Sequence, residues 1–278
     1  MNVLEAILLG AVEGLTEFLP ISSTGHLTVL EKLLGYQIDD PDITAFTAII
    51  QSGAVLATLL FFRRDLWRFL TAWVRGILAP GERANADYKF AWALILGTIP
   101  IGVVGLLFQD AIETTLRNLW FVGCAMIGFS FVMLFADRTA TQEREESQVT
   151  WRDTLIIGLA QCLAVVPGIS RSGATMSAGL LRGLDRVTAT KMAFFLSIPA
   201  LTGATLLQAV TKFDEIADGV GWTATLVATF TSFVVAYIAV AWLLRFIAHH
   251  TYTVFIVYRV TLGSLVLILL ATGAVAAT

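Results

Sequence analysis

The chain has 278 residues, of which 57% are hydrophobic and 14% are charged, and its mean hydropathy is +0.79. These values exclude an ordinary soluble domain, in which about a quarter of the residues are charged. The net charge of −3 says little by itself, because in a membrane protein the distribution of charge carries the information, and no nucleic-acid-binding surface is indicated. We therefore expect an all-α integral membrane protein with no nucleic-acid partner.

The first element in chain order is a pair of apolar segments, Val3–Leu19 and Leu27–Leu34. Neither reads as a complete span, which needs about 20 predominantly apolar residues. They are joined by the polar string Glu13-Gly-Leu-Thr-Glu17-Phe-Leu-Pro20-Ile-Ser22-Ser23-Thr24-Gly25-His26. We expect a re-entrant helical hairpin here, with its second half-helix beginning near His26. Such a break at membrane depth is tolerated only where protein or a cavity surrounds it.

Later stretches of the chain are long and apolar enough to cross a bilayer. The six predicted transmembrane helices lie at about Ile43–Phe62, Phe90–Phe108, Leu119–Ala136, Val187–Val210, Gly221–Leu244 and Val254–Val275. Between the third and the fourth, the segments Thr154–Val166 and Ala174–Leu181 flank the string Pro167-Gly-Ile-Ser170-Arg171-Ser172-Gly173-Ala-Thr175. This arrangement predicts a second re-entrant hairpin.

The two hairpins share one sequence pattern. They align without a gap at an offset of 148 positions, which sets Ser170 on Ser22, Gly173 on Gly25 and Gln161 on Glu13. We expect a single membrane domain made of two repeats, residues 1–136 and 154–278, joined by the polar loop 137–153.

The distribution of basic residues predicts the orientation in the membrane. Of the 18 lysines and arginines, most fall in four connections: Arg63, Arg64, Arg68, Arg75, Arg83 and Lys89; Arg138, Arg144 and Arg152; Arg182, Arg186 and Lys191; and Arg245. The other connections hold only Lys32, Arg117 and Lys212. By the positive-inside rule the four basic connections are cytoplasmic. The hairpins then enter from opposite sides, which gives an inverted-topology repeat whose re-entrant loops meet near the midplane.

Glu13 and Glu17 are the first candidate site residues. Their i, i+4 spacing places both carboxylates on one helical face. Two acids in an apolar helix repel unless a cation lies between them or one takes a proton. We expect a divalent-cation site at this pair; the alternative is a pair of interfacial acids facing outside water.

The hydroxyls that follow Pro20 form a second candidate group. Ser22, Ser23, Thr24 and Gly25 precede a half-helix whose N-terminus favours an anion. His26 has the unperturbed pKa suited to proton transfer near neutrality. We expect a functional role for this group, although capping accounts for one hydroxyl and a lone histidine is often structural.

The second string adds Ser170, Arg171, Ser172, Gly173 and Thr175. A guanidinium in a re-entrant loop needs an anionic partner, and its geometry matches phosphate or carboxylate. Arg171 therefore either binds substrate or forms an ion pair with Glu13 or Glu17, and the two are compatible.

Two further polar residues lie inside predicted spans. Gln51, in the first predicted span, is a candidate for lining a cavity where the two hairpins meet. Arg259 lies near one end of the last span, where snorkelling or a structural pair is expected rather than catalysis.

Carboxylates for a cation, an arginine with loop amides for phosphate oxygens, hydroxyls and a histidine together are typical of metal-assisted phosphoryl transfer. Because the site lies among membrane helices, we expect a lipid phosphate as substrate.

The two strings closely resemble the signature motifs of the bacterial undecaprenyl-diphosphatase family, the bacitracin-resistance proteins, and the resemblance covers essentially the whole chain. It implies hydrolysis of undecaprenyl diphosphate to undecaprenyl phosphate at the outer face of the bacterial inner membrane, supported by Mg²⁺ or Ca²⁺. It places function on Glu13, Glu17, Ser23, His26 and Arg171, and it leaves a homodimer open.

The nucleophile has two candidates at this stage. In one mechanism Ser23 attacks and His26 moves its proton, and in the other Glu17 activates a water. A different class of function also remains, because paired re-entrant hairpins are a common transporter design. The same anion site would then carry a polyprenyl phosphate across the bilayer.

Overall fold

A computed structural model describes residues 1–37, 40–108 and 118–275 of the chain, and its regular structure is helical apart from one isolated bridge between Arg144 and Leu184. Six of the helices are long and apolar enough to cross a membrane. They are α3 (Pro41–Phe61), α5 (Ala86–Leu107), α7 (Leu119–Thr139), α10 (Arg186–Thr211), α12 (Trp222–Ile247) and α13 (Thr253–Ala271). The all-α class and the six predicted spans are thereby confirmed.

Two pairs of shorter helices carry the polar strings. The first pair is α1 (Val3–Thr16) and α2 (Ser23–Leu33), and the second is α8 (Trp151–Gln161) and α9 (Arg171–Leu181), with the 3₁₀ turn η4 (Cys162–Val165) after α8. Both second helices begin three residues earlier than predicted. The reason is the serine before each one, which caps the helix with its own side chain. Ser23 and Arg171 are therefore the first residues of helices and not part of loops.

One basic connection contains a helix that the sequence analysis missed, α4 (Arg63–Leu78). Its arginines are interspersed among apolar residues, and Phe69 and Ala72 are buried. It packs against α5, and the 3₁₀ turn η1 (Pro80–Ala84) separates the two helices. Hydrophobic periodicity of this kind marks a helix with one buried face, but the high charge of the segment concealed it.

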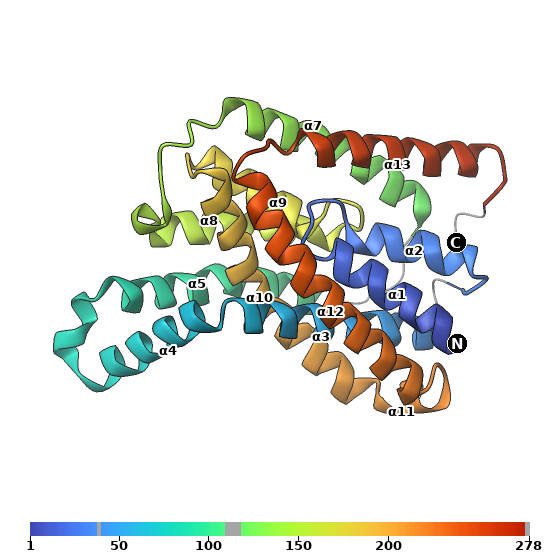
Figure 1. The fold of residues 1–278 in the computed structure, drawn as a ribbon, viewed down its shortest axis with the longest axis horizontal. Coiled ribbons are helices and arrows are strands. Elements are labelled where there is room, and N and C mark those ends of the chain that lie inside the picture. The colour runs from blue at the N-terminus through green and yellow to red at the C-terminus, as the bar shows by residue number, and fades with distance from the viewer. Residues whose placement is uncertain (38–39, 109–117, 276–278) are drawn as a thin grey trace.

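The longer helices pack against the short helices that carry the polar strings. Helix α1 packs against α12, and α8 packs against α5. Helices α7 and α13 lie side by side along one edge of the molecule (Figure 1). A short helix, α11 (Phe213–Asp218), follows α10.

An aromatic cluster supports the end of α1. The rings of Phe18 and Phe194 lie 5.1 Å apart edge to face, and the rings of Phe62 and Phe195 also lie 5.1 Å apart. All four side chains are buried. Because such pairs have a preferred geometry, they fix the backbone next to Glu17.

A polar network holds the start of α8. Arg144 and Arg182 both donate to Asp153, at 2.6 and 2.8 Å, and the Asp153 side chain is fully buried. Burial raises the pKa of Asp153, but hydrogen bonds from Arg144, Thr150 and Arg182 outweigh it and hold the pKa well below its usual range. The connecting loop is thus tied to both ends of the second pair.

Candidate functional site

The site is a cavity of about 680 Å³ between the two pairs of short helices and the spans α3, α5 and α10. Its polar lining includes Glu17, Ser22, Ser23, Thr24, Ser170 and Arg171. The volume lies within the ~300–1,000 Å³ range of small-molecule sites. Two strings far apart in the sequence therefore meet at one cavity, as their composition predicts.

Glu17 lies where α1 ends. It is the C-cap residue, and its N–H donates to the Glu13 carbonyl. The turn that follows leads into Pro20, which has no N–H to continue a helix. This ending directs the Glu17 side chain into the cavity wall, where only 5% of it is exposed.

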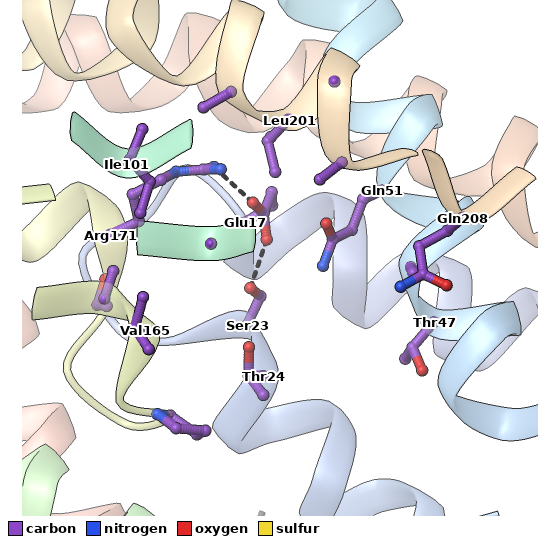
Figure 2. Close-up of a pocket in the computed structure, with 18 of the residues that line it drawn as sticks. Glu17, Ser23, Thr24, Thr47, Gln51, Ile101, Val165, Arg171, Leu201 and Gln208 are labelled. Carbon is purple, nitrogen blue, oxygen red and sulfur yellow. Dashed lines mark hydrogen bonds and ion pairs between the residues drawn. The ribbon is translucent and has the colours of Figure 1, made fainter. Parts of the chain in front are cut away.

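Ser23 and Arg171 both contact Glu17. The Arg171 guanidinium donates to one carboxylate oxygen at 2.6 Å, and the Ser23 hydroxyl donates to the other. Figure 2 shows the carboxylate between the two side chains. Charge-assisted hydrogen bonds of this kind are short and strong. The predicted ion pair between Arg171 and an acid of the first string is confirmed, with Glu17 as the acid.

The same unusual backbone geometry places both residues. Ser22 has φ = 74° and Ser170 has φ = 75°, a region that residues other than glycine seldom adopt. Each serine side chain accepts the N–H of the residue three positions later, Gly25 at 3.3 Å and Gly173 at 3.2 Å. Backbone strain held in this way is common at functional sites.

The remaining residues predicted to bind substrate divide into two groups. Ser22, Thr24, Ser170 and Gln51 line the cavity, whereas Gly25, Ser172, Gly173 and Thr175 do not. Ser172 donates to the Leu19 carbonyl at 2.8 Å and so connects the two strings. Thr175 donates to the Arg171 carbonyl at 2.8 Å. These residues shape the turns that carry the lining residues.

Comparison with known proteins shows which chains this one is similar to. Residues 6–265 match the family described as bacitracin resistance protein BacA. "Undecaprenyl-diphosphatase 3" of Frankia casuarinae is 68% identical over 278 residues, which is 100% of both chains. The undecaprenyl-diphosphatase of Cutibacterium acnes is 49% identical over 284 residues, again 100% of both chains.

The chain belongs to the BacA family. The resemblance carried by the two strings is thereby confirmed, and it extends over the full length of the chain.

In this BacA-family chain His26 is not among the residues that line the cavity. Its Nδ1–H donates to the Ser22 carbonyl at 2.7 Å, since a carbonyl only accepts. Its Nε2 lies 2.7 Å from the Tyr258 hydroxyl, and the two rings are nearly parallel. Within the described part of the chain, the hydroxyl of Ser23 reaches Glu17 and not His26. A proton-transfer role for His26 stays a prediction.

Glu13 is fully buried behind the cavity. Neither of its carboxylate oxygens has a hydrogen-bond partner among the described residues. The amide of Gln161, its counterpart in the second string, is equally buried and also without a partner there. An unpaired buried charge is costly, so the Glu13 carboxyl needs either a proton or a cation.

Arg259 has a role that the sequence analysis missed. The side chain is fully buried, so snorkelling is wrong. It donates to the carbonyls of Gly168 at 2.9 Å and Pro20 at 3.4 Å, one in each string, and to Ser130 Oγ at 3.1 Å. A single guanidinium therefore ties both turns to α7. Apolar neighbours in the sequence gave no sign of these backbone partners.

Proposed function

We propose that this BacA-family protein hydrolyses undecaprenyl diphosphate to undecaprenyl phosphate and inorganic phosphate at the cluster of Glu17, Ser23 and Arg171. Relatives that match it over their full length carry the name undecaprenyl-diphosphatase. The observation that carries the proposal is the double contact of Glu17 with Ser23 and Arg171 in the cavity wall. This arrangement combines a hydroxyl nucleophile, a carboxylate base that already accepts a hydrogen bond from that hydroxyl, and a guanidinium for phosphate.

Ser23 is the nucleophile in this mechanism. Its Oγ attacks the terminal phosphorus while its proton passes to Glu17, to which it already donates. The bond between that phosphorus and the bridging oxygen breaks, and undecaprenyl phosphate leaves. Water then attacks the phosphoserine, Ser23 recovers a proton, and inorganic phosphate is released. Direct attack by a water that Glu17 activates is the competing mechanism.

Arg171 neutralises and orients the diphosphate. Its side chain is 15% exposed and lines the cavity. In the absence of substrate, its partner is Glu17. Because a guanidinium matches phosphate oxygens as well as a carboxylate, the substrate would take over part of this contact and leave Glu17 free to act as a base.

The acids fit a divalent cation. Glu13 supplies a buried carboxylate without a partner among the described residues, and Glu17 lies one helical turn further on. Mg²⁺ is commonly held by one or two carboxylates together with substrate phosphates and water. Glu13 and Glu17 would hold the ion, and Mg²⁺ or Ca²⁺ would there neutralise charge on the phosphate oxygens.

The fold that carries this site is an inverted-topology repeat with two re-entrant hairpins. At the offset of 148 positions, the N-caps Asn2 and Thr150 both form capping boxes, and Ser22 and Ser170 share one backbone geometry. Likewise Gly10 approaches the backbone of α12, and Gly158 approaches that of α5. Such correspondence supports two copies of one structural unit.

The cavity opens toward the outer face of a bacterial inner membrane. The support comes from charge: the network of Arg144, Arg182 and Asp153 lies among the basic connections, which the positive-inside rule makes cytoplasmic. The cavity residues of α5 and α10 lie toward the opposite ends of those helices. Recycling a carrier lipid on the outer face requires an opening there.

The test is phosphate release from undecaprenyl diphosphate by the purified protein, with and without Mg²⁺, alongside Glu17→Gln and Arg171→Ala. We expect metal-dependent release that both variants lose. Arg64→Ala, which changes an exposed arginine outside the cavity, should retain activity. If the wild type binds the lipid and releases no phosphate with any metal, the same anion site serves transport of a polyprenyl phosphate instead.

A further inference from the structure

The cavity has two walls of different chemistry. Helices α2 and α3 contribute a polar wall, which includes Thr24, Thr28, Thr44, Thr47 and Gln51. Helices α5 and α10 contribute a wall of small and apolar residues, interrupted only by Thr98 and Gln208 among the lining residues. Figure 2 shows Thr47 and Gln51 on one side of the cavity and Ile101 on the other. A bound molecule with one polar and one apolar part would therefore be oriented.

Helices α5 and α10 contact each other at Gly97 and Leu196, whereas glycines further along both helices face open space. At the contact, a methyl group placed on Gly97 of α5 would lie 2.8 Å from Leu196 of α10. Further toward the C-terminal ends of the two helices, a methyl group added at Gly102, Gly105 or Gly203 would meet nothing within 4 Å. These three glycines line the cavity, so the space they leave open belongs to it.

A proline lies in each helix where this separation begins. Pro100 is in α5 between Gly97 and Gly102, and Pro199 is in α10 between Leu196 and Gly203. A proline inside a helix removes a backbone hydrogen bond and favours a bend. Each proline is followed by at least one glycine, so the outer halves of α5 and α10 leave open space at Gly102, Gly105 and Gly203.

We propose that this gap between the outer halves of α5 and α10 is the portal through which the polyprenyl tail of the substrate leaves the site for the bilayer. The inference rests on the proposed diphosphatase function. The gap is continuous with the cavity that contains Glu17 and Arg171. A diphosphate held at Arg171 places its tail against the mainly apolar wall of α5 and α10, because apolar surface avoids polar walls.

Two further observations favour a tail over another occupant. The cavity of about 680 Å³ is of a size that holds a drug-sized molecule, so a long polyprenyl chain must extend beyond it. Only 22% of the apolar stretch of α5 is buried inside the protein. A polyprenyl tail that leaves the cavity beside α5 therefore enters lipid directly and does not cross the polar wall.

The glycines are then the residues that set the width of the portal. A leucine at Gly203 or Gly105 would place a branched side chain in the path of the tail. A Cβ at either position meets nothing within 4 Å, so the first atom of the added side chain contacts neither Glu17, Ser23 nor Arg171. Substitution should therefore weaken substrate binding and leave the chemical step unchanged.

The experiment measures kcat and KM for undecaprenyl diphosphate with Gly203→Leu and Gly105→Leu, each made separately so that misfolding of one does not decide the result. Gly128→Leu is the matched control: Gly128 is a glycine of α7 that also has nothing within 4 Å but does not line the cavity. We expect KM to rise about tenfold in the portal variants, with kcat within about twofold of the wild type and no change in the control.

Equal KM values in the folded portal variants and the Gly128→Leu control would overturn the proposal. A loss of kcat without a rise in KM would also overturn it, because the glycines would then act on the chemistry. If the wild type itself releases no phosphate from the lipid, the proposed diphosphatase function fails. That result is distinct from equal KM values in the portal variants and the control.

Discussion

The two polar strings present different chemistry from the same backbone. Ser23 and Arg171 are equivalent positions at the offset of 148, and each is the first residue of a helix after a serine with positive φ. One position carries a hydroxyl and the other a guanidinium, and both contact Glu17. Glu17 itself is matched by Val165 in the second string. The acid is therefore present once, and both first residues converge on it.

This difference teaches how two turns of the same geometry build a single asymmetric site. The shared turn fixes where the two side chains begin. In the proposed mechanism, Ser23 is the nucleophile and Arg171 is the anion-binding group. The mechanism then makes the hydroxyls of the first string and the Arg171 guanidinium of the second complementary parts of one phosphoryl-transfer centre. Changes in equivalent residues should have unequal effects, and the following predictions test that inequality.

The largest effect is expected for Arg171. Arg171→Ala should lower kcat/KM by about 10³-fold, the scale of losing an arginine that neutralises transition-state charge. Arg171→Lys should recover only part of this loss, since a lysine keeps the charge but not the planar pair of donors. Steady-state phosphate release checks both. Activity of Arg171→Ala within tenfold of the wild type would mean that this residue serves only the resting ion pair with Glu17.

Arg259 should come next, because it holds both strings at once. Arg259→Lys loses most of the hydrogen bonds to Pro20 and Gly168, so we expect kcat to fall about 10–100-fold with a small change in KM. The unfolding temperature should also fall. Ser130→Ala is the control: it removes one partner of Arg259 at a cost of about 1 kcal/mol. An equal loss of kcat in that variant would contradict a role in positioning the strings.

The capping acids of α1 and α8 give a smaller and pH-dependent effect. Asp153 is buried between two arginines, whereas its equivalent Glu5 accepts from Tyr36 near the surface. Asp153→Asn should cost about 3 kcal/mol of stability, and Glu5→Gln should cost less. Thermal unfolding of the purified variants at pH 7 measures the two costs.

The sign of the pH dependence follows from the lowered pKa of Asp153. A carboxyl with a lowered folded-state pKa stabilises the protein above its unfolded value of about 3.9 and loses this contribution as pH falls through the folded value. Hydrogen bonds from Tyr36 and Asn2 lower the pKa of Glu5 as well. The wild type should therefore lose stability below about pH 4, and Asp153→Asn should lose less over that range. An identical acid profile in the variant would contradict the assignment.

The smallest effect is expected at the two serines with positive φ. Ser22→Gly and Ser170→Gly remove a side-chain cap but relieve an unfavourable backbone conformation, so each should change stability by only a few tenths of a kcal/mol. The two values should agree because the geometry is the same. Unequal unfolding free energies would show that the two turns are not equivalent.

Much of this organisation could be predicted from sequence because it depends on local patterns. Apolar length identified the spans, and the repeated string located the paired turns. The ion pair of Arg171 also followed, since a guanidinium among apolar residues requires a partner. By contrast, α4 was missed because its arginines hid a helical face.

The other omissions depend on tertiary contacts. Nothing in the sequence around Arg259 indicates that its partners are carbonyls of two distant turns. His26 stood among candidate residues in the sequence, but the orientation of its helix directs it to Tyr258. The separation of α5 and α10 depends on how two prolines at distant positions align in space. Such features are set by packing between segments and not by either segment alone.

The most direct test of the central claim is to look for a phosphorylated Ser23. The protein would be mixed with undecaprenyl diphosphate labelled in its terminal phosphate, quenched within a single turnover, and digested for mass spectrometry. A slow Glu17→Gln reaction and an inactive Ser23→Ala variant serve as controls. The mechanism predicts labelled phosphate on Ser23 that appears before free phosphate and is absent from Ser23→Ala. Release of labelled phosphate by Ser23→Ala at the wild-type rate, with no labelled serine in either protein, would contradict it.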